Sequence, residues 1–194
     1  MIFTDPKSGQ QLNAWWSPLY DTQAVLIAAV NFPAQLQFFN HTRGVAGRAV
    51  TNLERANEVV PPQRHEVLGI RAVLCTDTAG TPGLLEDLVD LQRNYGVVME
   101  VSGKSVFEGT FEYCTAGMGP HVGPQGAGAG TLDSAVNGVP AASAAVMFPE
   151  RLAIPLEGGE PFTVRLEGTP FALSSSVATV VRIYLEGIHF WPIN

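Results

Sequence analysis

Histidine and cysteine are the residues of this chain best suited to nucleophilic or metal chemistry. The sequence holds four histidines and two cysteines: His41, His65, His121, His189, Cys75 and Cys114. No histidine is spaced from another histidine or from a cysteine as metal ligands are. Cys114 and His121 could form a thiol–imidazole pair, but no third group orients them. We therefore expect no metal site and no catalytic residues.

Two glycine-containing segments resemble cofactor-binding loops only superficially. Ser102-Gly103-Lys104-Ser105 looks like the end of a phosphate-binding loop, but Val98 stands where that motif requires glycine, and a strand rather than a helix is expected to follow. Residues 123–130 are glycine-rich but lack the strand before and the helix after that dinucleotide binding requires. The sequence also has no G-x-S-x-G element. We expect no cofactor and no enzymatic activity.

The adjacent tryptophans Trp15-Trp16 indicate a function more specifically than the histidines, cysteines and glycine-rich segments do. Tryptophan combines a large apolar surface with a polar N–H group and is common at binding interfaces. Three roles remain open for the pair: anchors inserted into a neighbouring subunit, packing of one ring onto the protein's own sandwich, or a platform for a sugar ring. The residues that we expect to contact partners are Trp15, Trp16, Leu19, Tyr20, His121 and Leu132.

The composition indicates a protein whose surface is largely buried against other subunits in an assembly. Charged residues are 15% of the 194 residues, and only two of the 11 basic residues are lysines, Lys7 and Lys104. Lysine normally covers solvated surface, whereas arginine suits interfaces. The net charge of −7 disfavours direct contact with nucleic acid. The longest apolar run, Ala24–Val30, is too short for a membrane span, and the first residues show no secretory signal pattern.

Hydrophobic periodicity predicts an all-β fold with one short helix. Alternating or continuous apolar residues predict strands at 24–30, 67–75, 97–101, 105–113, 152–156, 162–166 and 177–191. Gly187 predicts a bulge or bend in the last of these. Leucines at helical spacing over 84–91 predict the helix. This pattern favours an antiparallel β-sandwich of the jelly-roll type.

Two segments fall outside this pattern. Residues 1–22 are expected to form an extended arm that can be deleted, up to residue 20, without unfolding the sandwich. Residues 23–194 are expected to form a single domain, interrupted by a long Gly/Ala-rich loop at 114–145. Such a loop in a small domain is usually functional or mobile. Residues 40–63 are expected to be an exposed connection.

Three stretches together resemble known proteins: Arg64–Arg71, Phe148–Pro155 and Arg182–Ile188. Over roughly residues 60–194 the chain resembles bacteriophage virion structural proteins of the single jelly-roll capsid or capsid-decoration (cement) type. The resemblance implies a homotrimer or other homo-oligomer in the virion, bound to the major capsid protein, with no catalytic residues. A small jelly-roll coat subunit and a carbohydrate-binding jelly-roll module, lectin-like or receptor-binding, remain as alternatives.

Overall fold

The description of the fold rests on a computed structural model. It describes residues 2–4, 9, 11–25, 31–75, 83–114, 121–124, 133–136, 147–173 and 179–193. Within these residues the protein is mostly β-structure. Two antiparallel sheets lie face to face, with two short α-helices at their margins. The predicted antiparallel sandwich is therefore confirmed, with a second short helix that the sequence did not predict.

The larger sheet is built on two long central strands. β5 (Arg64–Cys75) and β13 (Thr179–Pro192) pair over most of their length. β11 (Ile154–Leu156) continues the sheet beyond β5, while β2 (Gln11–Trp16) and β3 (Leu19–Val25) pair one after the other with the opposite edge of β13. β1 (Ile2–Thr4) pairs with β2. The long apolar runs of β5 and β13 suit central strands that are covered on both sides.

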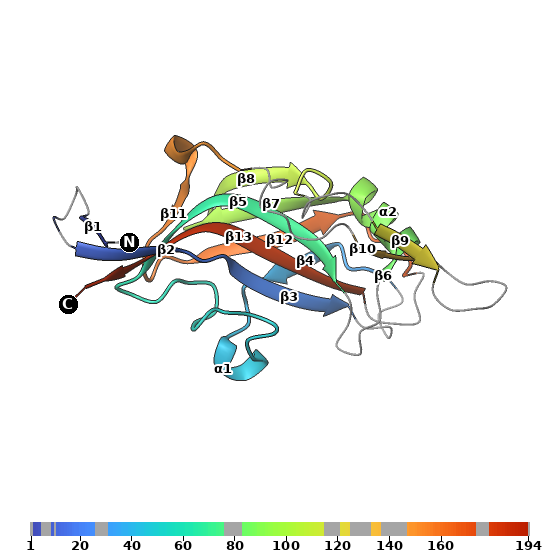
Figure 1. The fold of residues 1–194 in the computed structure, drawn as a ribbon. Coiled ribbons are helices and arrows are strands. Elements are labelled where there is room, and N and C mark those ends of the chain that lie inside the picture. The colour runs from blue at the N-terminus through green and yellow to red at the C-terminus, as the bar shows by residue number, and fades with distance from the viewer. Residues whose placement is uncertain are drawn as a thin grey trace.

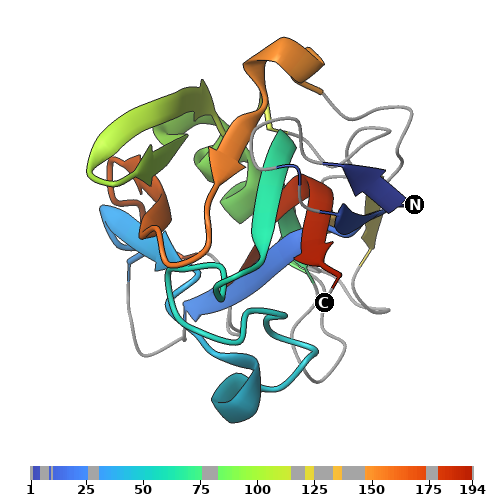
Figure 2. The same ribbon diagram turned by 90° about the vertical axis from the view of Figure 1, so that its left-hand side faces the viewer.

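The smaller sheet has the strand order β4-β12-β7-β8. Its strands are β4 (Gln35–Phe38), β12 (Phe162–Gly168), β7 (Tyr95–Val101) and β8 (Lys104–Thr110). Every second residue of β7, and of β12 as far as Leu166, is buried, which is typical of strands with one face on a core. Figure 2 shows this sheet beside the larger one. Met99 and Val164 from the smaller sheet, and Leu74 and Ile183 from the larger, are fully buried in the core between them.

A small third sheet and the longer helix lie at one end of the molecule (Figure 1). This sheet consists of β6 (Gly83–Leu84), β10 (Asp133–Val136) and β9 (His121–Pro124). The helix α2 (Leu85–Asn94) buries Leu88 and Leu91, as its leucine spacing predicts. The expected loop at 114–145 therefore contains two paired strands, and most of its other residues lie outside the described ones.

The structure corrects the expectation of an N-terminal arm over residues 1–22. Residues 11–25 form two strands of the main sheet, and Leu12 and Leu19 are buried. A break at Ser17-Pro18 separates the strands, and it lies opposite Glu186-Gly187, where a bulge in β5 shifts the register between β5 and β13. At this bulge Glu186 pairs with Gly69 and Gly187 with Val67, and the Ser17 N–H donates to the Gly187 carbonyl at 3.1 Å. An irregularity is present at Gly187 as predicted, but the extra residue is Leu68 of β5, and the break at Ser17-Pro18 hid the two strands in the sequence.

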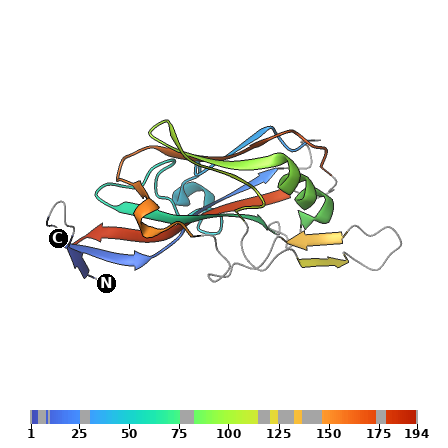
Figure 3. The same cartoon turned by 90° about the horizontal axis from the view of Figure 1, so that it is seen from above.

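One end of the main sheet extends beyond the smaller sheet. There β1, β2 and the last residues of β13 form a narrow ribbon, and both chain ends lie on it (Figures 1 and 3). We refer to these residues, 2–4, 11–16 and 188–193, as the projecting end. The short helix α1 (Arg43–Ala46) belongs to the connection that leads from β4 to β5.

Candidate functional site

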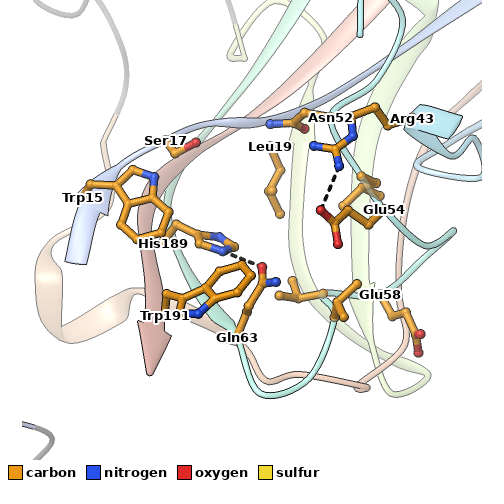
Figure 4. Close-up of a pocket in the computed structure, with 13 residues that line it drawn as sticks. Trp15, Ser17, Leu19, Arg43, Asn52, Glu54, Glu58, Gln63, His189 and Trp191 are labelled. Carbon is orange, nitrogen blue, oxygen red and sulfur yellow. Dashed lines mark hydrogen bonds and ion pairs between the residues drawn. The ribbon is translucent and has the colours of Figure 1, made fainter. Parts of the chain in front are cut away.

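A pocket of about 210 Å³ lies where the projecting end joins the sandwich. One part of its lining comes from β2, β3 and β13, and the other from the connection between β4 and β5. Its main side chains are Trp15, Leu19, Arg43, Asn52, Glu54, Glu58, Gln63, His189 and Trp191 (Figure 4). The pocket thus combines an aromatic wall with polar and charged groups.

The aromatic wall follows from strand pairing. Trp15 lies directly opposite His189 in the β2–β13 register, so the two side chains share one face of the sheet. Their ring centroids are 5.2 Å apart at 46°. Trp191 is two residues beyond His189 and therefore lies on the same face. Trp15 is 40% exposed and Trp191 is 45% exposed, so both indoles present surface to solvent.

The imidazole of His189 is held in place and is neutral. Its Nε2 lies 2.8 Å from Oε1 of Gln63, and we assign it as the donor because the amide oxygen can only accept. Burial lowers the pKa of His189. Behind it lies His65, which is fully buried, with a ring centroid 5.8 Å away. Burial, together with the neighbouring His189, lowers the pKa of His65 to about 3. The aromatic wall therefore carries no charge at neutral pH.

The opposite side of the pocket carries an ion pair (Figure 4). Nη2 of Arg43 lies 2.9 Å from Oε1 of Glu54, and both side chains are more than a third exposed. Such a pair contributes little to stability because water screens it. Glu58 also lines the pocket, and it is paired with Arg55 at 3.0 Å. The charges of this side are therefore largely balanced.

Asn52 fixes the connection against β3. Its Oδ1 accepts from the backbone N–H of Tyr20 at 2.9 Å, and its Nδ2 donates to the carbonyl of Pro18 at 2.8 Å. The hydroxyl of Thr51 donates to the Tyr20 carbonyl at 2.9 Å. Further along, the Arg43 N–H donates to the Leu53 carbonyl at 2.6 Å. These bonds hold the polar side of the pocket at a fixed distance from the aromatic wall.

Asp21 anchors the start of the same connection. Its carboxylate accepts from the N–H of Phe39 at 2.7 Å and lies 3.2 Å from Nδ1 of His41. Phe39 has a φ of 64°, a conformation that non-glycine residues rarely adopt, and its side chain is fully buried. Burial raises the pKa of Asp21, and the hydrogen bond from Phe39 opposes that rise. Asp21 thereby stabilises the turn from which the pocket loop departs.

The structure separates the residues that the sequence grouped as partner contacts. Trp15 lines the pocket, whereas Trp16, 52% exposed, faces the other side of β2. Leu19 packs in the core, so little of it is left for a partner. Tyr20 is half-buried, and its hydroxyl donates to the Arg48 carbonyl at 2.6 Å. The side chain of His121, and Leu132, lie outside the described residues.

The sequence did not single out most of the pocket. Trp191 and His189 alternate at the end of a predicted strand, and this pattern could have indicated a shared face. Arg43, Glu54 and Gln63 gave no such signal because they lie in a segment without periodicity. Tertiary folding alone brings them beside β13.

Neither thiol has the character of a nucleophile. Cys75 and Cys114 are both free, and burial raises the pKa of Cys114 to about 12 and raises that of Cys75. In the described part of the chain, no three His, Cys, Asp or Glu side chains are grouped closely enough to hold a metal ion. Nor does any described helix have the length and apolar character needed to cross a bilayer.

Comparisons with known proteins do not extend this picture. No protein-family model matches the chain, and no curated protein and no solved structure matches it either.

Proposed function

We propose that this protein is a structural component of a virion, namely a capsid-decoration (cement) protein that binds the major capsid protein and its own copies. The observation that carries the proposal is the projecting end, where apolar side chains are exposed on a ribbon that reaches beyond the sandwich. Ile2 is 69% exposed, and Trp16 and Ile193 also present apolar surface there. Exposed apolar groups gathered on one feature mark interaction sites more often than scattered ones do.

The backbone of the projecting end supports the same role. Among the described strands, β1 pairs only with β2, so its other edge is open to a further strand. An open edge can bind an extended segment of a partner through main-chain hydrogen bonds. Trp16 would add a side-chain anchor beside that edge, since buried tryptophans often dominate binding energy.

The composition agrees with attachment through many weak contacts. The low charge and the scarcity of lysine suit a surface that is covered in an assembly. An oligomer, for which we propose a trimer, would bind several capsid sites at once and so dissociate far more slowly than a single copy. We further propose a jelly-roll order for the strand connections, and a location on the outside of the capsid without direct contact with the genome.

Co-sedimentation with viral heads tests the proposal. Heads that lack the endogenous protein are mixed with purified wild type or Trp16→Ala protein and separated on a gradient. We expect wild type to sediment with the heads and Trp16→Ala to bind at least about tenfold more weakly. Tyr113→Ala is the matched control, because Tyr113 is an exposed aromatic residue outside the projecting end; it should bind like wild type.

Two outcomes would overturn the proposal. One is a monomer in sedimentation that has no affinity for heads. The other is equal head binding by wild type and Trp16→Ala, which would remove the projecting end as the attachment element. A protein that instead closes into shells on its own would be a coat subunit rather than a decoration protein.

A further inference from the structure

The pocket beside Trp15 indicates a function separate from assembly, because its walls combine the features that binding of a sugar ring requires. A pyranose ring has an apolar face of C–H groups and an equatorial rim of hydroxyls. The face needs a flat apolar surface, and the rim needs planar polar groups that donate and accept. Trp15 and Trp191 supply the first, and Arg43 and Glu54 supply the second from the opposite side (Figure 4).

We propose that this pocket binds one neutral sugar ring, with its apolar face against Trp15 or Trp191 and its hydroxyls on the Arg43–Glu54 pair. A carboxylate accepts from two neighbouring hydroxyls, and a guanidinium donates in a fixed fork. The two groups already lie 2.9 Å apart and remain more than a third exposed, so a diol can reach both. Hydrogen bonds to ionised groups are the stronger kind.

The charge balance selects a neutral ligand over an anionic one. Arg43 and Glu54 cancel each other, Glu58 is paired with Arg55, and His189 is neutral. A sialic acid or a phosphate would therefore bring its charge near two carboxylates with no unpaired cation among the described lining residues. Like charges held close together disfavour binding.

The size of the pocket limits what it can hold. Its volume of about 210 Å³ is below the ~300–1,000 Å³ of sites for drug-sized ligands. One ring therefore occupies it, and further rings of an oligosaccharide would extend into solvent. The exposure of Trp191 gives such an extension a second apolar surface on which to rest.

The site is preformed in the free protein. Gln63 holds His189, and Asn52 holds the opposite loop to β3, as the hydrogen bonds above show. A ligand then has few side chains to immobilise, which reduces the entropic cost of binding. This makes millimolar affinity for a single ring attainable from a small contact area.

Binding is tested with the methyl glycosides of glucose, galactose, mannose and N-acetylglucosamine. Tryptophan fluorescence and titration calorimetry of the full chain report affinity at up to tens of millimolar sugar. We expect at least one glycoside to bind, and Trp15→Ala to weaken it at least about tenfold. Trp16→Ala is the matched control, because the neighbouring indole faces the other side of β2 and its loss should leave sugar affinity unchanged.

Further arms make each outcome decisive. Trp15→Phe keeps an aromatic ring, so it should retain most of the binding if Trp15→Ala loses it through lack of stacking rather than through misfolding. Sialyllactose should bind more weakly than lactose. No detectable binding of any of the neutral glycosides would overturn the proposal, as would equal binding by wild type and Trp15→Ala. Loss of head attachment in Trp15→Ala without any sugar binding would assign the pocket to a partner side chain instead.

This result is separable from the assembly proposal. Trp16 is the variant that should detach the protein from heads, and Trp15 is the variant that should abolish sugar binding. Either function can therefore fail in these experiments while the other stands.

Discussion

Trp15 and Trp16 are adjacent in the chain but serve different surfaces, because neighbouring residues of a strand point to opposite faces. Trp15 contacts His189 and lines the pocket, and Trp16 stands on the other face with 52% of its surface exposed. The sequence identified the pair as unusual and left three roles open, but it did not say which indole would take which role. Only the register with β13 assigns a separate role to each residue.

The lowered pKa of the buried His65 imidazole leads us to expect that the protein loses stability in acid. Its folded-state pKa of about 3 lies below the ordinary value of 6.5, so below pH 6.5 the unfolded chain binds a proton that the native state does not. The stability present above pH 6.5 is therefore lost as pH falls toward 3. We expect about 1.4 kcal/mol of lost unfolding free energy per pH unit between roughly pH 5.5 and 4.5. Urea unfolding at several pH values measures this slope.

The difference between wild type and His65→Leu isolates this residue. Leucine does not titrate, and groups remote from His65 whose pKa shifts, such as Asp21, contribute alike to both proteins, whereas the neighbouring His189 is coupled to His65 and is affected by the change. The unfolding free energy of the variant should therefore fall less steeply as the pH is lowered. The difference in unfolding free energy between the two proteins should change with pH by the slope that the binding of about one proton gives. Parallel pH profiles would show that His65 becomes protonated without cost in the folded state.

The candidate site was only partly predictable at the scale of single residues. Trp15 was found because tandem tryptophans are conspicuous in a charge-poor chain. Arg43 and Glu54 were not found, because nothing local marks a surface ion pair as part of a pocket. Asn52 is likewise inconspicuous in sequence, and its importance comes from two backbone groups of the 18–20 segment, more than 30 residues away.

At the scale of elements, alternation predicted those strands that have one face on the core. Phe162–Gly168 alternates regularly and forms β12, and the long final run forms β13 as expected. The helix predicted from leucine spacing over 84–91 forms as α2, which begins one residue later and ends three residues later. The prediction failed for β2 and β3, where Ser17-Pro18 interrupts the alternation.

The paired irregularity at Gly187 and Ser17-Pro18 yields a prediction about the main sheet. A Cβ on Gly187 would fall on the carbonyl oxygen of Glu66, a backbone atom that cannot move aside cheaply. We expect Gly187→Ala to destabilise the protein by about 2–3 kcal/mol or more, because overpacking would force β5 and β13 apart. Thermal unfolding followed by circular dichroism measures the loss.

Gly44→Ala is the control for that measurement. Gly44 lies in α1, has an ordinary φ, and a Cβ there meets no atom within 4 Å. Alanine should therefore be neutral or slightly stabilising, by up to about 1 kcal/mol. Equal melting temperatures for the two variants would mean that the bulge tolerates a side chain and that the close approach at Glu66 is relieved elsewhere.

In the whole molecule, the pocket and the projecting end lie toward the same end, and the third sheet (β6, β10 and β9) and α2 lie at the opposite end (Figure 1). The sandwich acts as a rigid support for both, since its core is continuous from β4 to β13. The sequence predicted the division into a rigid body and an adhesive N-terminal segment. It could not predict that this segment is itself part of the sheet, because strand pairing with residues some 170 positions away leaves no local mark.

This integration changes what truncation should do. Deleting residues 1–10 removes β1 but leaves β2, β3 and their buried leucines in place, so the melting temperature should stay close to that of the wild type while head binding weakens through loss of Ile2 and of the open edge. Deleting residues 1–20 also removes Leu12 and Leu19, each of which contributes about 1.5–3 kcal/mol when buried.

The longer deletion should therefore lose a large share of the roughly 5–15 kcal/mol that stabilises a typical domain. We expect it to unfold at a much lower temperature, or to be recovered as aggregate, because the edge of β13 loses its partners from Tyr184 onward and keeps only residues 21–25 of β3. Circular dichroism melts and gradient sedimentation of both truncations decide the matter. If the variant lacking residues 1–20 had the same melting temperature as the wild type, residues 11–20 would be an arm that contributes nothing to the stability of the sheet. The edge of β13 would then be stable without them.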